Sequence, residues 1–212
     1  MDQATIVMTV EGVAVTPVIT GTAADYTLTY DPPADFGYLQ VVDVTIDADD
    51  LAGNAMTTDS YSFAAEATVD ISLKAGWNMV SVPVTPADNS TSAVFPGVAG
   101  VFTWNATSRS YYEPTVIDPE KGYWVAVTEN TTIAINGTPI ETWTTDIKAG
   151  WNMIGSVNTS ASIADPNDDP DGSVIPPAYW WDPVSKSYVL TTDIEPGKGY
   201  WVASVNDCVL TL

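Results

Sequence analysis

The residues with the clearest potential for chemistry are the oxygen-bearing side chains in the acidic stretch 165–172. Asp165, Asn167, Asp169 and Asp171 stand at alternate positions of the sequence Asp-Pro-Asn-Asp-Asp-Pro-Asp-Gly. Ca²⁺ takes about six to eight oxygen ligands, and alternating Asp and Asn residues in a tight loop can supply them. The stretch lacks the glycine and the bidentate glutamate of an EF-hand, because proline occupies both positions. It therefore predicts either a calcium site or a solvated loop stiffened by proline.

No familiar catalytic set can be assembled from the sequence. The chain has no histidine and a single cysteine, Cys208, which excludes Ser-His-Asp and Cys-His arrangements and an intramolecular disulfide. A glycosidase needs two carboxylates across a cleft, and no pair of acidic residues is singled out by its position. We expect Cys208 to be a small hydrophobic residue of a strand. We also expect no enzyme activity, and no cofactor apart from the Ca²⁺ considered above.

Five asparagines stand in Asn-x-Ser/Thr sequons, which accept N-linked glycans in exported proteins. They are Asn89, Asn105, Asn130, Asn136 and Asn158. Five sequons exceed the chance expectation for this composition, although a chain rich in serine and threonine raises that expectation. The excess favours a glycosylated surface protein.

The charge of the chain narrows the partners that it can bind. It carries 27 acidic and 6 basic residues, a net charge of −21. Nucleic-acid binding depends on basic side chains that neutralise phosphate, and an acidic surface repels anionic membranes. No apolar run has the length of a membrane span. We therefore expect no nucleic-acid partner and no direct membrane insertion.

The elements that position these residues are predicted to be strands. Short segments of alternating β-branched and aromatic residues, such as 26–30 and 41–46, are separated by clusters of Gly, Pro, Asp and Asn. No stretch shows a helical apolar period over the length of a helix. The predicted fold class is all-β.

The second part of the chain is an internal duplication. Three blocks recur in the same order, at offsets of 74, 77 and 77 residues: 74–80 with 148–154, 104–111 with 181–188, and 118–126 with 195–203. The middle block predicts a hairpin whose turn begins at Asn105 or Asp182. The third block predicts a Pro-containing turn that leads into a Tyr-Trp-Val-Ala strand.

Six of the eight tryptophans occupy matched positions: Trp77 with Trp151, Trp104 with Trp181, and Trp124 with Trp201. Because an indole buries a large apolar area, we expect these six to fill the core of the repeats. Trp143 and Trp180 are unmatched and are therefore freer to face solvent. Trp180 and its neighbour Tyr179 are the expected ligand-binding residues if the protein binds sugars.

All six basic residues are also matched between the copies: Lys74 with Lys148, Arg109 with Lys186, and Lys121 with Lys198. In so acidic a chain, three retained cations indicate a local role. We expect ion pairs with nearby carboxylates or a stem lying over an aromatic ring. Binding of an anionic ligand is the alternative.

The segment 26–63 resembles the second half of a bacterial immunoglobulin-like domain. The matching features are Tyr-Thr-Leu-Thr-Tyr-Asp-Pro-Pro at 26–33, the strand 41–46, Asp-Leu-Ala-Gly-Asn at 50–54 and Tyr-Ser-Phe at 61–63. The Gly-Trp-Asn and Gly-Tyr-Trp-Val blocks are similar to repeats in surface-layer and adhesin-like proteins of bacteria and archaea. The resemblance implies that the first strands of the sandwich are missing here. Either the sequence is a cut piece of that domain, or another chain donates a strand.

We therefore expect residues 1–68 to form a partial immunoglobulin-like β-sandwich. Residues 69–212 should form one pseudo-twofold β-domain, with copy one at 69–143 and copy two at 144–212. Copy two ends opposite Ile135, so the extra segment 136–143 of copy one should bridge the two copies.

The expected function is a non-catalytic structural or adhesive module of a large extracellular, cell-surface protein. Its partners would be other domains or copies of the same protein, and glycans. One alternative is a carbohydrate-binding module that uses exposed Trp and Tyr side chains. A second alternative is a filament subunit completed by strand donation. If the matched indoles line an open groove instead of the interior, the binding alternative becomes the better interpretation.

Overall fold

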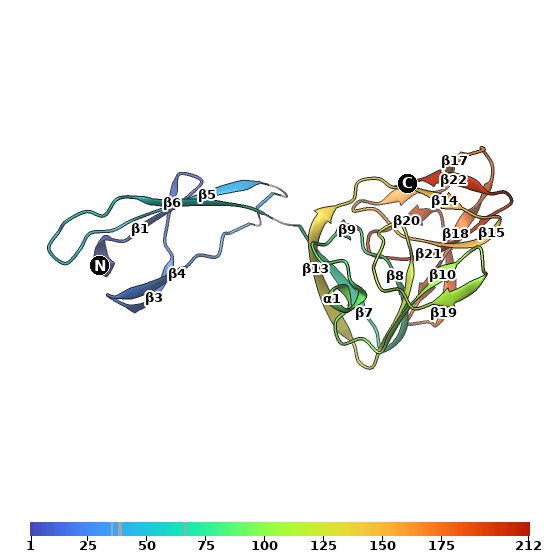
Figure 1. Cartoon of the computed structure of the whole chain (residues 1–212), viewed down its shortest axis with the longest axis horizontal. Coiled ribbons are helices and arrows are strands. Elements are labelled where there is room, and N and C mark those ends of the chain that lie inside the picture. Colours follow the sequence, from blue (N-terminus) through green and yellow to red (C-terminus); the bar gives the residue numbers. More distant parts are fainter. Residues whose placement is uncertain (35, 38–39, 66) are drawn as a thin grey trace. The chain divides into compact units, whose positions relative to one another are not determined.

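The computed structural model describes residues 1–34, 36–37, 40–65 and 67–212. Within these ranges the chain consists of strands β1 to β22, a 3-10 turn (Gln3–Thr5) and one short α-helix, α1 (Thr91–Val94) (Figure 1). The predicted all-β class is confirmed. The chain divides into two compact units, Met1–Glu66 and Ala67–Leu212. No helix of the described ranges is long and apolar enough to cross a membrane.

Unit 1 is a four-stranded antiparallel sheet with an additional hairpin. The sheet has the order β2-β1-β5-β6, and β3 pairs with β4. The strands are β1 (Val7–Val10), β2 (Val13–Val15), β3 (Val18–Thr22), β4 (Asp25–Thr29), β5 (Val41–Asp47) and β6 (Asp59–Ala64). Its core is small and consists of four buried side chains of β1 and β5: Met8, Val10, Val42 and Val44. Alternation along β5 places Val42 and Val44 on the buried face.

Copy one of the duplication contains the helix α1 and seven strands. They are β7 (Ala67–Leu73), β8 (Gly76–Val80), β9 (Val84–Thr85), β10 (Gly100–Asn105), β11 (Ser110–Tyr112), β12 (Tyr123–Val127) and β13 (Thr131–Pro139). They form two antiparallel sheets of order β11-β10-β12-β8 and β7-β13-β9.

Copy two repeats this arrangement. Its strands are β14 (Thr144–Ile147), β15 (Gly150–Ile154), β16 (Ala161–Ser162), β17 (Asn167–Asp169), β18 (Val174–Asp182), β19 (Ser187–Thr191), β20 (Asp193–Ile194), β21 (Tyr200–Ser204) and β22 (Cys208–Thr211). The sheet of order β19-β18-β21-β15 matches the first sheet of copy one strand by strand. The sheet β14-β22-β17 differs in its third strand, because β17 comes from the acidic stretch that copy one lacks.

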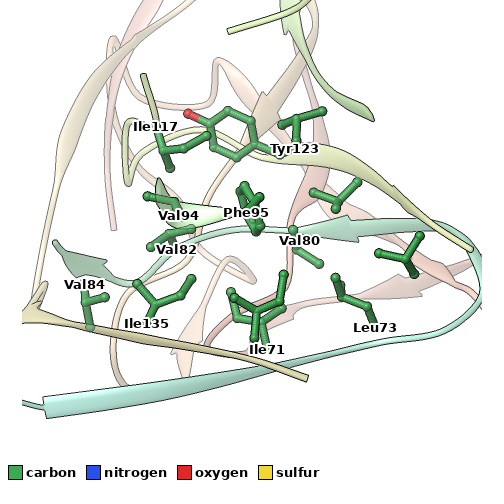
Figure 2. Packing of buried hydrophobic residues seen from close by; sticks show 14 residues of the cluster. Ile71, Leu73, Val80, Val82, Val84, Val94, Phe95, Ile117, Tyr123 and Ile135 are labelled. Atoms are coloured by element: carbon green, nitrogen blue, oxygen red, sulfur yellow. The ribbon is translucent and has the colours of Figure 1, made fainter. Parts of the chain in front are cut away.

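Each copy has its own hydrophobic core, built mainly of aliphatic side chains. In copy one these come from both sheets and α1, with Phe95 and Tyr123 as the aromatic members (Figure 2). The core of copy two includes Cys208, as predicted, and Trp143. The six matched tryptophans belong to neither cluster. Trp201 is buried in a third core cluster, and Trp104, Trp124 and Trp181 pack partly buried against it, whereas Trp77 and Trp151 are about half exposed. The prediction that all six fill the core therefore holds for Trp201 and fails for Trp77 and Trp151.

The tyrosine of the Gly-Tyr-Trp-Val block is the aromatic residue that each core uses. Tyr123 and Tyr200 are almost completely buried. Their hydroxyl oxygens accept hydrogen bonds from the N–H groups of Asp118 (2.7 Å) and Glu195 (2.9 Å), which fixes the turn before each strand. Burial raises the pKa of Tyr200 to about 12 and raises that of Tyr123 further.

The two copies meet through reciprocal contacts. The N–H of Gly122 donates to the carbonyl of Met153 (3.3 Å), and that of Gly199 donates to the carbonyl of Met79 (3.2 Å). At the centre, the hydroxyls of Ser81 and Ser156 lie 2.7 Å apart. The Gly-to-Met contact thus occurs twice, with the roles of the two copies exchanged. Such reciprocal contacts define a twofold interface. Residues 67–212 are thus one body with pseudo-twofold symmetry.

The segment 136–143 bridges the copies, as predicted. The N–H of Ile140 donates to the carbonyl of Pro83 in copy one, and its carbonyl accepts from the N–H of Asn158 in copy two. Trp143 exchanges two backbone hydrogen bonds with Leu212 and lies in the core of copy two, 8% exposed. The expectation that the unmatched Trp143 faces solvent is wrong, because this bridge carries it into the partner copy.

Candidate functional site

The matched tryptophans lie on the sheet faces that point away from the two cores. In β12, Tyr123 and Val125 point to the core of copy one, so Trp124 points to the opposite face. Met79 pairs with Trp124 across the strands, and Trp77 shares the face of Met79. In copy two, Met153 pairs with Trp201 in the same way. Each copy thus presents an aromatic face built from the same sheet.

The two aromatic faces meet along the joint between the copies. Met79, Met153 and Trp201 are buried at the centre, with four further rings packed around them: Trp104, Trp124, Tyr179 and Trp181. Rings from different copies pack edge to face. Trp104 and Trp201 have centroids 5.4 Å apart, and Trp124 and Trp181 5.6 Å apart.

Two indole N–H groups tie the copies together. Trp104 Nε1 donates to the carbonyl of Trp151 (2.9 Å), and Trp181 Nε1 donates to the carbonyl of Trp77 (3.1 Å). A third indole is used within copy one, where Trp124 Nε1 donates to the hydroxyl of Tyr111 (3.2 Å). These bonds hold the rings in place and consume donors that a ligand would otherwise meet.

Two open grooves of about 550 Å³ each lie on this aromatic surface. The first, here called the Trp151 groove, is lined by Trp104, Tyr111, Trp151, Tyr179, Tyr188 and Trp201. The second, the Trp77 groove, is lined by Trp77, Phe102, Tyr111, Trp124, Trp181 and Tyr188. Every lining residue is an uncharged aromatic.

Several of these rings are open to a ligand. Trp77 and Trp151 are 48% and 49% exposed, and Tyr111 and Tyr188 are exposed to a similar degree. Burial raises the pKa of Tyr188, and a hydrogen bond with Trp201 acts in the opposite direction. Large, contiguous apolar surfaces of this kind mark binding sites.

The two predicted ligand-binding residues, Tyr179 and Trp180, lie on opposite faces of their strand. Tyr179 lines the Trp151 groove, where its ring packs against Trp151 with centroids 5.4 Å apart. Trp180, its neighbour along the strand, points to the other face and packs against the core of copy two. Lys198 Nζ lies 4.0 Å above its ring. Trp180 therefore stands outside both grooves.

Three of the six matched cations form ion pairs with nearby carboxylates, as predicted. Lys121 pairs with Asp118 at 2.5 Å, Lys148 with Asp207 at 3.2 Å, and Lys198 with Glu195. The third matched pair, Arg109 and Lys186, adopts φ values of 53° and 54° in the turns of the hairpins β10–β11 and β18–β19. These are left-handed backbone conformations that non-glycine residues rarely adopt.

The predicted turn residues begin these hairpins. Asn105 Oδ1 accepts hydrogen bonds from the N–H groups of Thr107 and Ser108. Asp182 accepts from Ser185 and from the N–H of Val184, which lowers the pKa of its carboxyl group below the ordinary value.

The acidic stretch forms a strand where the sequence predicts a loop. Asn167 and Asp169 lie in β17, which pairs with β22, while Asp165 precedes the strand and Asp171 follows it. The carboxylate that is buried is that of Asp168, which was not among the predicted ligands. It accepts hydrogen bonds from the N–H groups of Gly172 and Val174. In the part of the chain that the structure describes, no group of three or more acidic or thiol side chains is placed to hold a metal ion.

Four of the five sequon asparagines are exposed: Asn89, Asn105, Asn130 and Asn136. Three of these use Oδ1 as a hydrogen-bond acceptor within the protein, among them Asn130, which accepts from the N–H of Ala75. Asn158 is half-buried, and its Oδ1 is buried without a hydrogen-bond partner. It is the sequon least open to a modifying enzyme.

The grooves combine residues that the sequence marks as matched with residues that it does not mark. Phe102 was missed because the repeat blocks begin two residues later, at Trp104. Its partner by the 77-residue offset is Tyr179, so extending the alignment backwards by two residues finds it. Comparison of the chain with protein-family models, characterised proteins and solved structures finds no match to any of them.

Proposed function

We propose that this chain is a non-catalytic adhesive module of an exported microbial surface protein and that it binds neutral carbohydrate in its two aromatic grooves. The observation that supports the proposal most directly is the exposure of Trp77 and Trp151, which is close to half of each side chain. A purely architectural repeat gains nothing from leaving its largest apolar side chains in water. Two matched exposed indoles indicate a ligand.

The chemistry of the grooves favours sugar rings. A pyranose presents a face of C–H groups that packs against the face of an aromatic ring, while its hydroxyls point outwards to polar groups and water. The tyrosine hydroxyls of the grooves supply such polar groups. The volume of each groove lies within the usual range for small-molecule sites. A single quaternary ammonium head would fill only a small part of it.

Charge and hydrogen bonding argue against two other occupants. The net charge of −21 repels acidic polysaccharides, and the lining offers no cation to offset that repulsion. Proline-rich peptides dock in aromatic grooves and also need donors for their backbone carbonyls. The N–H groups of Trp104, Trp124 and Trp181 already donate within the protein.

The surface location rests on several features together. The exposed sequons, the acidic composition and the resemblance of unit 1 to immunoglobulin-like domains support an extracellular protein. The pairing of β1, β5 and β6 in one antiparallel sheet is compatible with part of such a sandwich. Presenting a rigid aromatic surface is a natural role for a module of a cell-surface protein.

The test is retention of the chain on three insoluble neutral polysaccharides: cellulose, chitin and mannan. We expect wild-type protein to be retained on at least one, and the double variant Trp77→Ala, Trp151→Ala to lose at least tenfold in retention. Tyr112→Ala is the matched control, because Tyr112 is exposed on the same hairpin as Tyr111 but lines neither groove. Circular dichroism checks that every variant is folded.

Three results would overturn the carbohydrate assignment. The first is no retention of wild-type protein on any of the three polymers. The second is equal retention of the double variant. The third is a change of tryptophan fluorescence on adding a decaproline peptide, with no change on adding the sugars. This result would assign the grooves to a peptide.

A further inference from the structure

The two grooves are equivalent, residue by residue. Each takes three rings from one copy: Trp77, Phe102 and Trp124 in the Trp77 groove, and Trp151, Tyr179 and Trp201 in the Trp151 groove. Each takes one tryptophan from the other copy, Trp181 or Trp104. Both Tyr111 and Tyr188 line both grooves. The duplication has therefore produced two equivalent grooves. It has not produced a single groove in one copy with a purely structural second copy.

The joint between the copies keeps the two grooves in a fixed relation. The indole bonds Trp104 to Trp151 and Trp181 to Trp77 cross the joint in opposite directions. The hydroxyls of Ser81 and Ser156 are completely buried at its centre. At Gly122 and Gly199 the backbones approach so closely that a Cβ on Gly199 would lie 3.2 Å from the Cα of Gly122. Such a joint does not let the grooves turn relative to each other.

The symmetry decides how a polymer can use both grooves. A polysaccharide has a direction, from its non-reducing to its reducing end. A twofold rotation that relates two sites also reverses the direction in which a polymer must run through them, whenever the polymer lies across the axis. One continuous strand would therefore meet the second groove in the wrong orientation. Two separate strands can occupy equivalent grooves without this conflict.

We propose that the Trp77 and Trp151 grooves are separate sites and that one chain therefore joins two glycan strands. This inference rests on the proposed carbohydrate function. A module with two fixed sites is retained on a polymer network more strongly than either site alone would allow, because the second binding event is intramolecular. The surface protein would thereby crosslink the glycan layer to which it adheres.

The linings of the two grooves differ at one pair of equivalent positions. Tyr179 in the Trp151 groove stands where the Trp77 groove has Phe102. The hydroxyl of Tyr179 adds one polar group for a sugar, so the Trp151 groove should bind more tightly. Exchanging these residues, with Phe102→Tyr and Tyr179→Phe in one chain, should reverse the order of the two affinities.

The experiment is calorimetric titration of the whole chain with cellohexaose, chitohexaose and mannohexaose. Wild-type protein should bind two molecules of the active oligosaccharide per chain. Trp77→Ala and Trp151→Ala should each bind one, because each removes a ring that lines a single groove. On the insoluble polymer each single variant should be retained less than wild type by about a hundredfold or more.

Stoichiometry separates this inference from the function on which it rests. Binding of one oligosaccharide per wild-type chain, abolished by either single variant, would show one continuous site and would overturn the inference while leaving the carbohydrate function intact. Binding of none of the three oligosaccharides, together with no retention on the polymers, would overturn both. The Tyr112→Ala control should bind two.

Discussion

At the scale of single residues, the Gly-Trp-Asn triplet divides three tasks. Gly76 and Gly150 adopt φ values of 103° and 108°, which favour glycine. Trp77 and Trp151 line the grooves. Asn78 and Asn152 are buried, and each closes the preceding turn by accepting from the N–H and donating to the carbonyl of the lysine four residues earlier. The motif thus sets both the turn and the ligand surface.

We predict that Asn78→Ala and Asn152→Ala destabilise the protein, each by about 1–3 kcal/mol. Either change removes the partners of two part-buried backbone groups of the lysine four residues earlier, and an unsatisfied group costs up to about that much. Urea unfolding measured by tryptophan fluorescence provides the free energy of unfolding. Asn89→Ala is the control, because Asn89 is exposed, and it should change stability by less than about 0.5 kcal/mol. A variant at Asn78 as stable as wild type would show that the turn does not need the amide.

At the scale of elements, the Gly-Tyr-Trp-Val strands β12 and β21 serve the core and the grooves at the same time. Alternation sends Tyr123 and Tyr200 inward and Trp124 and Trp201 to the aromatic face. The glycine before each tyrosine lies against the other copy. A Cβ on Gly122 would lie 2.8 Å from the carbonyl oxygen of Ile154, and one on Gly199 would lie 2.6 Å from that of Val80.

Gly122→Ala and Gly199→Ala should therefore weaken the joint between the copies. The added methyl group meets backbone atoms that cannot move without displacing a strand, and overpacking of this kind costs about 1–3 kcal/mol. We expect a lower Tm for both variants in differential scanning calorimetry. Gly37→Ala serves as the control, since among the described residues its Cβ would meet only the side chain of Gln40, at 3.5 Å. An unchanged Tm for both joint variants would contradict the described packing.

At the scale of the whole molecule, residues 67–212 form one folding unit although they contain two copies of a sequence. Copy one contributes Trp143 to the core of copy two, and the carbonyl of its Ile140 accepts from the N–H of Asn158 in copy two. Each aromatic face would expose a row of indoles and a methionine if its partner copy were absent. Neither copy is complete by itself.

We predict that a fragment of residues 67–212 unfolds in one cooperative transition, whereas fragments 69–143 and 144–212 expressed separately do not fold. Separation exposes the apolar surface of the joint to water and leaves the core of copy two without Trp143. Far-ultraviolet circular dichroism measures the strand content of each fragment, and its change on heating shows whether the fragment unfolds cooperatively. Mixing the two halves should restore the transition. A cooperative, concentration-independent transition of 69–143 alone would refute the interlocked description.

The sequence by itself determined the fold class, the duplication, the hairpins that begin at Asn105 and Asp182, and the pairing of three of the six cations with nearby carboxylates. These features depend on neighbours within a few residues, or on the comparison of two copies, and both can be read along the chain. The bridge at 136–143 was also predicted, and the backbone hydrogen bonds of Ile140 to Pro83 and Asn158 confirm it.

Only the tertiary structure decided which face of each strand is the interior. In Tyr-Trp-Val-Ala both faces are apolar, so alternation shows that Tyr123 and Trp124 are separated without showing which one is buried. That choice depends on what the second sheet of each copy packs against. The matched indoles lie at the joint between the copies, where Trp201 is buried and only Trp77 and Trp151 are open to solvent. The same holds for Asp168, whose carboxylate is held by the N–H groups of Gly172 and Val174. Burial is set by partners that are distant in the sequence, and it decides between a core residue and a binding residue.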